Sequence, residues 1–146
     1  MSDAIKLRDA NLDDKHALVA LTAELGYETT SAEIQQRLSQ ILDKPDHKVF
    51  VAVSDKDSVL GWIHVYYHPV LMKDVLAELG GLVVTENARN QGIGKLLLIK
   101  AQDWAKQVGC QLMVVRTRST RLGAHRFYEE AGYQFWKDQK VYTKDL

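Results

Sequence analysis

The sequence has little of what marks secreted, membrane and nucleic-acid-binding proteins. Its single cysteine, Cys110, cannot form an intrachain disulfide, and residues 1–9 lack the apolar core of a secretory signal, so we expect a cytoplasmic protein. No run approaches the about 20 apolar residues that span a membrane. Basic and acidic residues number 19 each, whereas a broad nucleic-acid surface needs an excess of cations. We therefore expect neither a membrane nor a nucleic acid as partner.

The sequence also lacks linkers and a metal-binding pattern. With only two prolines and 146 residues, 46% of them hydrophobic, it has the size and composition of a single domain over residues 1–146. The five histidines show no ligand spacing. His64 and His68 share a strand face but stand about 13 Å apart along it, too far to bind one zinc ion together. We expect no metal.

Hydrophobic periodicity predicts an α/β (α+β) fold. Asn11 with Asp14, and Thr30 with Glu33, form capping boxes that open two helices, and Gly26 ends the first. The predicted strands are 5–9, 49–53, 59–67, 77–84, 112–115 and 135–142, and the predicted helices are 11–25, 30–41, 92–108 and 122–131. A central mixed sheet flanked by helices is the simplest packing for this order.

A glycine-containing loop joins the strand that ends at Val84 to the helix that follows. Its pattern is Arg89-x-x-Gly92-x-Gly94, and unpaired amides at a helix start form an anion site. A Walker A loop would need glycine at Arg89 and Ser or Thr at Leu96, and the dinucleotide-binding pattern would need a third glycine further along. The loop is a candidate phosphate site, although an ordinary tight turn explains the pattern equally well when it is taken alone.

Two segments together carry a family resemblance. The first is the glycine loop after Leu82-Val83-Val84, and the second is the block from Ala124 to Tyr133, in which a helix ends in Gly132-Tyr133. Both resemble the motifs of the GNAT N-acetyltransferase superfamily and stand in that family's order. One departure is that Ser119-Thr120 stand where many members carry an asparagine that touches the coenzyme.

The resemblance implies the GNAT fold and a ternary complex in which an amine attacks the thioester of acetyl-CoA directly. A splayed pair of strands would hold the coenzyme, with its amide-rich arm along the strand edge at 82–84. Gly80-Gly81 is where a bulge that splays the strands is expected. The coenzyme-binding residues implied are Leu82, Val83, Val84, Arg89, Asn90, Gln91, Gly92, Ile93, Gly94, Lys95 and Tyr128.

Two residues are candidates for the chemistry. By the resemblance, Tyr128 is the general acid that protonates the leaving thiolate; the alternative is a core aromatic residue. Glu78 is the candidate general base, because a carboxylate on a mostly apolar strand needs a reason; the alternative is an acid that faces solvent. Strand alternation places its side chain on one face with those of 80, 82 and 84.

The acceptor is not identified by the sequence. The expected partner is a primary amine of a small molecule or a peptide, and His64, Tyr66 and His68 are candidates to line its side of the site. The alternative function is a non-catalytic acyl-CoA sensor, or an interaction module that exposes one of its tryptophans, Trp62, Trp104 or Trp136. A homodimer is left open.

Overall fold

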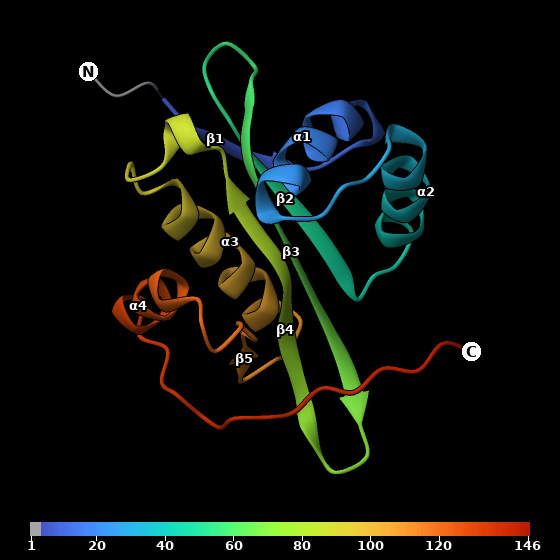
Figure 1. Cartoon of the computed structure of the whole chain (residues 1–146), viewed down its shortest axis with the longest axis vertical. Helices are drawn as coiled ribbons and strands as arrows, with labels where there is room; N and C mark the ends of the chain where they lie inside the picture. Colours follow the sequence, from blue (N-terminus) through green and yellow to red (C-terminus); the bar gives the residue numbers. More distant parts are fainter. Residues whose placement is uncertain (1–3) are drawn as a thin grey trace. The chain divides into compact units, whose positions relative to one another are not determined.

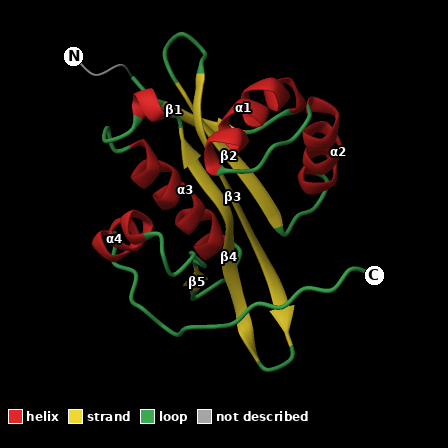
Figure 2. Ribbon diagram, in the orientation of Figure 1, coloured by secondary structure: helices red, strands yellow, loops and turns green. Residues whose placement is uncertain are grey.

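The structure is a computed structural model that describes residues 4–146. Backbone contacts divide the chain into two compact units, Met1–Val115 and Arg116–Leu146, and each is described by itself. Figure 1 follows the chain from blue to red, and Figure 2 distinguishes helices from strands. A single domain over residues 1–146 stays a prediction.

The first unit is built on an open mixed sheet, as the hydrophobic pattern predicts. Its strands are β1 (Lys6–Asp9), β2 (His47–Val53), β3 (Val59–Val70), β4 (Lys73–Val84) and β5 (Met113–Val114). They lie in the order β1-β2-β3-β4-β5, with every neighbouring pair antiparallel except β4 and β5, which are parallel. The long β3–β4 hairpin reaches its tip at Leu71 and Met72, beyond the predicted strand ends.

Helices cover both faces of this sheet (Figure 1). On one face, α1 (Lys15–Leu25) and α2 (Ser31–Leu42) contribute Leu18 and Leu38 to a core cluster with Val51 of β2. On the other face lies α3 (Ile93–Gln107), where the ring of Trp104 packs 5.7 Å from that of Tyr67 on β3. The sheet is therefore the middle layer of the unit.

The predicted helix starts are confirmed in detail. Thr30 and Glu33 form a complete capping box at the start of α2. Asn11 and Asp14 form another, although the first turn there, Leu12–Asp14, is a 3-10 helix. Gly26 ends α1 in the left-handed conformation with φ 109°. Each of these capping signals depends on residues within a few positions of the helix end, so it does not require contacts with distant parts of the chain.

Strand β4 carries the predicted bulge. His64 of β3 lies opposite Gly81 and Val65 lies opposite Leu79, so Gly80 is an extra residue in β4. A bulge residue reverses the alternation of the side chains that follow it. Glu78 therefore lies on one face of the sheet, opposite Tyr66, and Leu82 and Val84 lie on the other. The expectation that Glu78, Gly80, Leu82 and Val84 share one face is wrong for this reason.

The second unit consists of one helix and an irregular segment. Helix α4 is Leu122–Glu130, and Gly132 follows it with φ 94°, as predicted. The predicted strand at 135–142 is wrong, because residues 131–146 form no helix or strand. A strand requires a partner for its backbone, and nothing within this unit pairs with the segment. Its large apolar side chains are exposed, Val141 at 86% and Tyr142 at 84%.

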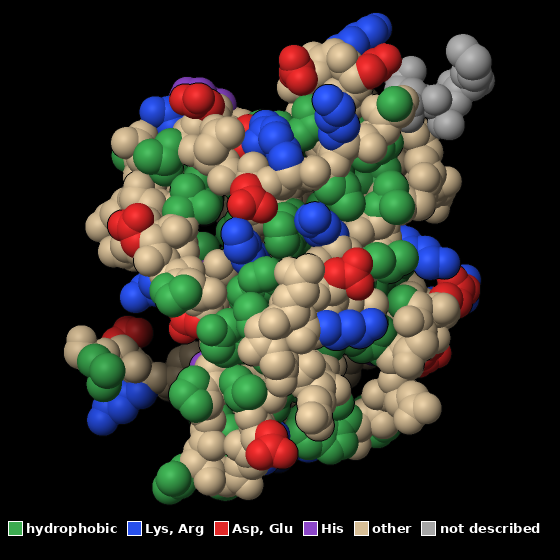
Figure 3. Space-filling model, turned by 180° about the vertical axis from the view of Figure 1, so that it is seen from behind, with side chains coloured by type: hydrophobic (Ala, Val, Ile, Leu, Met, Phe, Trp, Pro, Cys, Tyr) green, Lys and Arg blue, Asp and Glu red, His purple; other side chains and the backbone are tan. Residues whose placement is uncertain are grey.

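Two expectations about the surface can be compared with the structure. No helix in residues 4–146 is long and apolar enough to cross a membrane. Lysine and arginine side chains are interspersed with acidic ones on the face shown in Figure 3. On that face, therefore, no broad field of one sign forms.

Candidate coenzyme site and acceptor face

The edge of β4 toward β5 opens along its second half. Strand β5 pairs only with Ala77 and Glu78, so the edge beyond them meets no strand among the described residues of the first unit. The amide of Thr85 donates to the carbonyl of Leu60 at 2.8 Å. Because backbone groups alternate along an antiparallel strand, those of Leu82 and Val84 then point away from β3, toward the open edge. Strand β5 ends after these two pairs, so the edge of β4 beyond Glu78 can accept an added strand-like ligand.

The glycine loop presents backbone amides at the start of α3. Asn90 and Gly92 both have positive φ, 63° and 81°, and Ile93 is buried at 1% exposure and fixes the turn to the core. The first helical hydrogen bond runs from the amide of Leu96 to the carbonyl of Gly92 at 3.0 Å. The amides of residues 93–95 therefore lack helical acceptors, which suits an anionic group such as a diphosphate.

Arg89 is held at the end of β4 by contacts that the sequence did not indicate. Its Nε donates to the carbonyl of Val84 at 2.9 Å, and its guanidinium lies 3.5 Å from a carboxylate oxygen of Glu24 at the end of α1. The same carboxylate accepts from the hydroxyl of Thr85 and the amide of Glu86, both at 2.9 Å. Glu24 thus stabilises the junction between β4 and the loop. No local sequence pattern could have revealed this contact, because Glu24 is 61 residues from Thr85 and still further from Arg89.

The sheet face that carries Glu78 also carries His47, His64 and Tyr66. These four polar residues are called the ring cluster. Nδ1 of His47 and Nε2 of His64 lie 2.9 Å apart, and the hydroxyl of Tyr66 donates to the carboxylate of Glu78 at 2.5 Å. The ring of His47 stacks on both His64 and Tyr66, with centroids 5.2 and 5.1 Å away. The structure therefore brings Glu78 together with two of the residues expected on the acceptor side.

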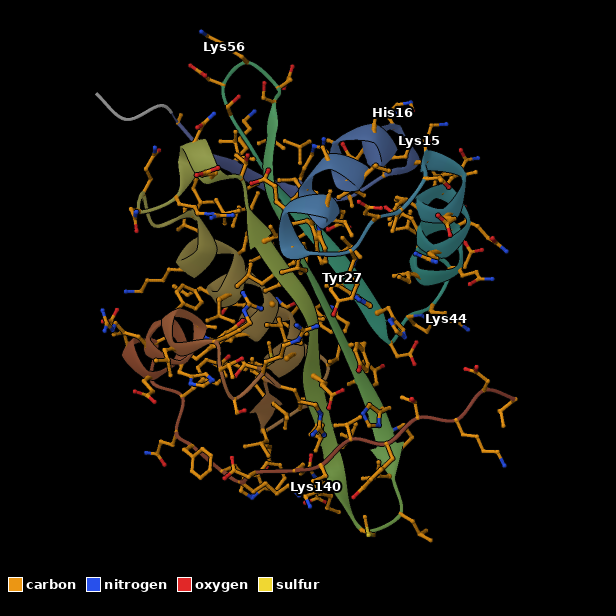
Figure 4. The ribbon with its side chains drawn as sticks, in the orientation of Figure 1. Lys15, His16, Tyr27, Lys44, Lys56 and Lys140 are labelled. Carbon is orange, nitrogen blue, oxygen red and sulfur yellow. The ribbon has the colours of Figure 1, made fainter. Side chains whose placement is uncertain are left out.

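His68 stacks on Tyr66 at the end of the same row, 5.8 Å between ring centroids. His47, by contrast, was missed, because Lys48 separates it from the apolar run of β2 that begins at Val49, and because its partner is set by strand register. Lys44, labelled in Figure 4, lies in the turn just before it. Burial, with a smaller contribution from His47, lowers the pKa of His64 to about 4. At neutral pH the His64 ring is therefore uncharged.

Tyr128 belongs to the second unit, where its ring meets Phe127 and Tyr133 edge to face, at 5.0 and 5.7 Å. Burial raises the pKa of its phenol to about 12, against a smaller opposing effect of Arg121. The phenol therefore keeps its proton at neutral pH. The role of Tyr128 toward the coenzyme, like that of Ser119 or Thr120, stays a prediction.

The other expected features are also located. Within residues 4–146 no group of three His, Cys, Asp or Glu side chains is arranged to hold a metal ion. Cys110 is buried, which raises the pKa of its thiol and fits a packing role. Of the three tryptophans, Trp104 is buried at 8% exposure and Trp136 is exposed at 53%.

An open strand edge beside helix-start amides is compatible with a ligand that carries both a diphosphate and amide groups, as coenzyme A does. The sequence matches the Acetyltransferase (GNAT) family over residues 15–133, and the chain belongs to this family. It is thus an acetyl-CoA-dependent acetyltransferase, as the motifs of the loop and of α4 predict.

Two curated relatives and one solved structure illustrate the likeness. The chain is 31% identical over 132 residues to an aminoalkylphosphonate N-acetyltransferase of Salmonella typhimurium, covering 88% of this chain and 84% of that one. It is 26% identical over 138 residues to an aminoglycoside N(6')-acetyltransferase type 1 of Serratia marcescens, covering 92% and 94%. The structure of the aminoglycoside N-acetyltransferase AAC(6')-Iy in complex with CoA has a TM-score of 0.88 at 19% identity, covers 100% and 98%, and shows the same fold.

Proposed function

We propose that this protein transfers the acetyl group of acetyl-CoA to a primary amine of a small molecule or a peptide, by direct attack in a ternary complex. The observation that carries the proposal is the open edge of β4 at Leu82 and Val84, directly before the amides of the glycine loop. When bound, the coenzyme supplies an acetyl group activated as a thioester. The lone Cys110 supports a cytoplasmic setting for this chemistry.

The chain's own groups suit the two ends of such a ligand. The amides of residues 93–95 would bind its diphosphate, with Gln91 and Lys95 beside it, and the backbone of Leu82 and Val84 would pair with its amide-rich arm. Because the diphosphate end lies beyond Val84, the arm would run back along β4. Its reactive end would then lie near Gly80 and the ring cluster.

Glu78 and Tyr128 have separate tasks in this proposal. An amine is mostly protonated at neutral pH and must lose a proton before it can attack. Glu78, with one oxygen bonded by Tyr66, would take that proton directly or through water. Tyr128 would donate a hydrogen bond to the sulfur as the carbon–sulfur bond breaks. With a pKa of about 12, well above the about 8.5 of a thiol, it stabilises the developing charge more readily than it gives up its proton.

The acceptor we propose is a small polar amine. Its support is the pair of relatives named for aminoglycosides and aminoalkylphosphonates, together with the polar composition of the ring cluster. The test is thiol release from acetyl-CoA with kanamycin, 2-aminoethylphosphonate, spermidine and a peptide with a free N-terminus. Turnover with any of them, and acetylamide product by mass spectrometry, is expected. Tight binding of acetyl-CoA by calorimetry without turnover of any amine would instead indicate a sensor.

A further inference from the structure

We infer that Glu24 and Arg89 are positioning residues of the coenzyme site. Together they hold the junction between β4 and the glycine loop, and Arg89 acts through this contact and not as a ligand of the diphosphate. Because the site belongs to the proposed function, this role rests on that proposal. It gives the end of α1 a part in coenzyme binding, and it changes the role that the family resemblance implies for Arg89.

The carboxylate of Glu24 supplies hydrogen-bond acceptors that the junction itself lacks. Residues Glu86–Ala88 form a short 3-10 turn after β4, in which only Ala88 is buried, and the side chain of Thr85 at its N-cap makes no capping hydrogen bond. One oxygen of Glu24 accepts from the amide of Glu86, and the other accepts from the hydroxyl of Thr85, each at 2.9 Å. Amides at the start of a turn have no acceptor within it, so Glu24 takes the place of a local cap.

Arg89 closes the same junction from its other end. Its Nε donates to the carbonyl of Val84 at 2.9 Å. One of its terminal nitrogens lies 3.5 Å from the oxygen of Glu24 that also accepts from the amide of Glu86. Two of the three guanidinium nitrogens thus already have partners in the protein, at the end of β4 and on α1.

The turn that leads to the free helix-start amides begins directly after Arg89. Only residues 90–92 separate Arg89 from Ile93, whose buried side chain fixes the other end of the turn. All three are exposed, and Asn90 and Gly92 have positive φ, so the turn is held mainly through the residues that flank it. A loop that is fixed before its ligand arrives loses less conformational freedom on binding. Loss of either partner of the Glu24–Arg89 contact should therefore weaken coenzyme binding.

The sign of a charge effect distinguishes this role from a direct one. A carboxylate near a diphosphate repels it, so the removal of the negative charge of Glu24 would by itself tighten coenzyme binding. If Arg89 were a ligand of the diphosphate, Glu24 would compete for its guanidinium, and Glu24→Gln would again tighten binding. A positioning role predicts weaker binding, because glutamine loses the ion pair and has one acceptor oxygen where the carboxylate has two.

The test measures acetyl-CoA binding to the whole chain by calorimetry. Glu24→Gln should weaken binding about tenfold, because a loop that was fixed must then be ordered by the ligand. Arg89→Lys keeps the positive charge but has no planar fork to bond Val84 and Glu24 together, so it should weaken binding to a similar extent. The double variant should bind about as weakly as the single ones, because both act through one contact. Glu28→Gln, which removes the same charge from the exposed segment after α1, is the matched control and should keep full affinity.

A kinetic readout separates positioning from stability. In Glu24→Gln the KM for acetyl-CoA should rise about tenfold, while kcat with the best amine of the panel above should stay within about twofold, because the reacting atoms lie at the other end of the coenzyme. Both side chains of the pair are partly exposed, at 49% and 31%, and such ion pairs add little to global stability. The melting temperature should therefore change little. A residue that only stabilises the fold would lower the melting temperature and leave KM unchanged.

The outcomes separate this role from the proposed function. Unchanged or tighter binding in Glu24→Gln would overturn the positioning role and leave the proposed function standing, as would full affinity in Arg89→Lys. Additive losses in the double variant would also overturn it, because Arg89 would then contact the coenzyme itself. If the wild-type protein binds no acetyl-CoA, the proposed function fails and the positioning role fails with it. If thermal melts show that Glu24→Gln is unfolded, Arg89→Lys decides.

Discussion

Replacing Tyr128 by phenylalanine separates a chemical role from a packing role. The ring contacts with Phe127 and Tyr133 depend on the aromatic ring, which phenylalanine keeps. Within residues 116–146 the hydroxyl has no hydrogen-bond partner that would be lost. We therefore expect the melting temperature at neutral pH to change little.

The expected effect on catalysis is much larger. A positioned donor contributes about 10²- to 10⁴-fold, so the activation free energy in Tyr128→Phe should rise by about 3 to 5 kcal/mol. The assay is kcat at saturating amine and acetyl-CoA, with the dissociation constant of acetyl-CoA measured beside it. A kcat within twofold of wild type would refute the role of the hydroxyl and leave thiolate protonation to water.

The raised pKa of Tyr128 adds an independent check on stability. The folded chain holds the phenol proton up to a pKa of about 12, whereas the unfolded chain loses it near the ordinary value of 10. Folded protein therefore binds more protons in this window, and the free energy of unfolding falls as the pH rises from 10 to 12. Tyr128→Phe should show a shallower fall in urea titrations across that window. Some slope should remain, because burial also raises the pKa of Tyr133 to about 12.

Three further substitutions test the loop and the glycines. Gln91→Glu adds a negative charge to the exposed glycine loop and should weaken acetyl-CoA binding about tenfold by calorimetry. The control Gln107→Glu, at the far end of α3, should leave the affinity unchanged. Equal affinity in both variants would argue against a diphosphate site at the glycine loop. Gly81→Ala would place Cβ 2.6 Å from the ring of Trp62 and should cost about 1–3 kcal/mol in urea unfolding. Gly123→Ala in α4 meets nothing within 4 Å and should stabilise by about 0.5–1 kcal/mol; destabilisation would contradict that open space.

The glycine loop also shows why some substitutions are poor tests. Because Gly92 has φ 81°, a bulky residue there would strain the backbone as well as block a ligand. Loss of binding in Gly92→Val would therefore not distinguish the two effects. Gln91 avoids the difficulty, since its side chain is exposed and its substitution leaves the turn unchanged.

Local signals predicted much of the fold. The capping boxes at Asn11 and Thr30, the glycine that ends α1 and the strand–loop–helix passage around Gly92 all lie where the sequence puts them. Each depends on residues within about four positions of one another, so the chain carries the whole signal at one place. The family resemblance draws on two such passages, which is why it could be recognised without a structure.

What tertiary structure alone decided is which distant residues meet. The extra residue Gly80 moves Glu78 to the face of Tyr66, and the β2–β3 register brings His47 to His64. The brace from Glu24 to Arg89 joins the end of α1 to a loop far along the chain. The segment 135–142 has a strand-like apolar pattern but forms no strand. Such a pattern forms a strand only where another backbone pairs with it. Strand partners and registers are properties of the assembled sheet, and periodicity within one strand does not contain them.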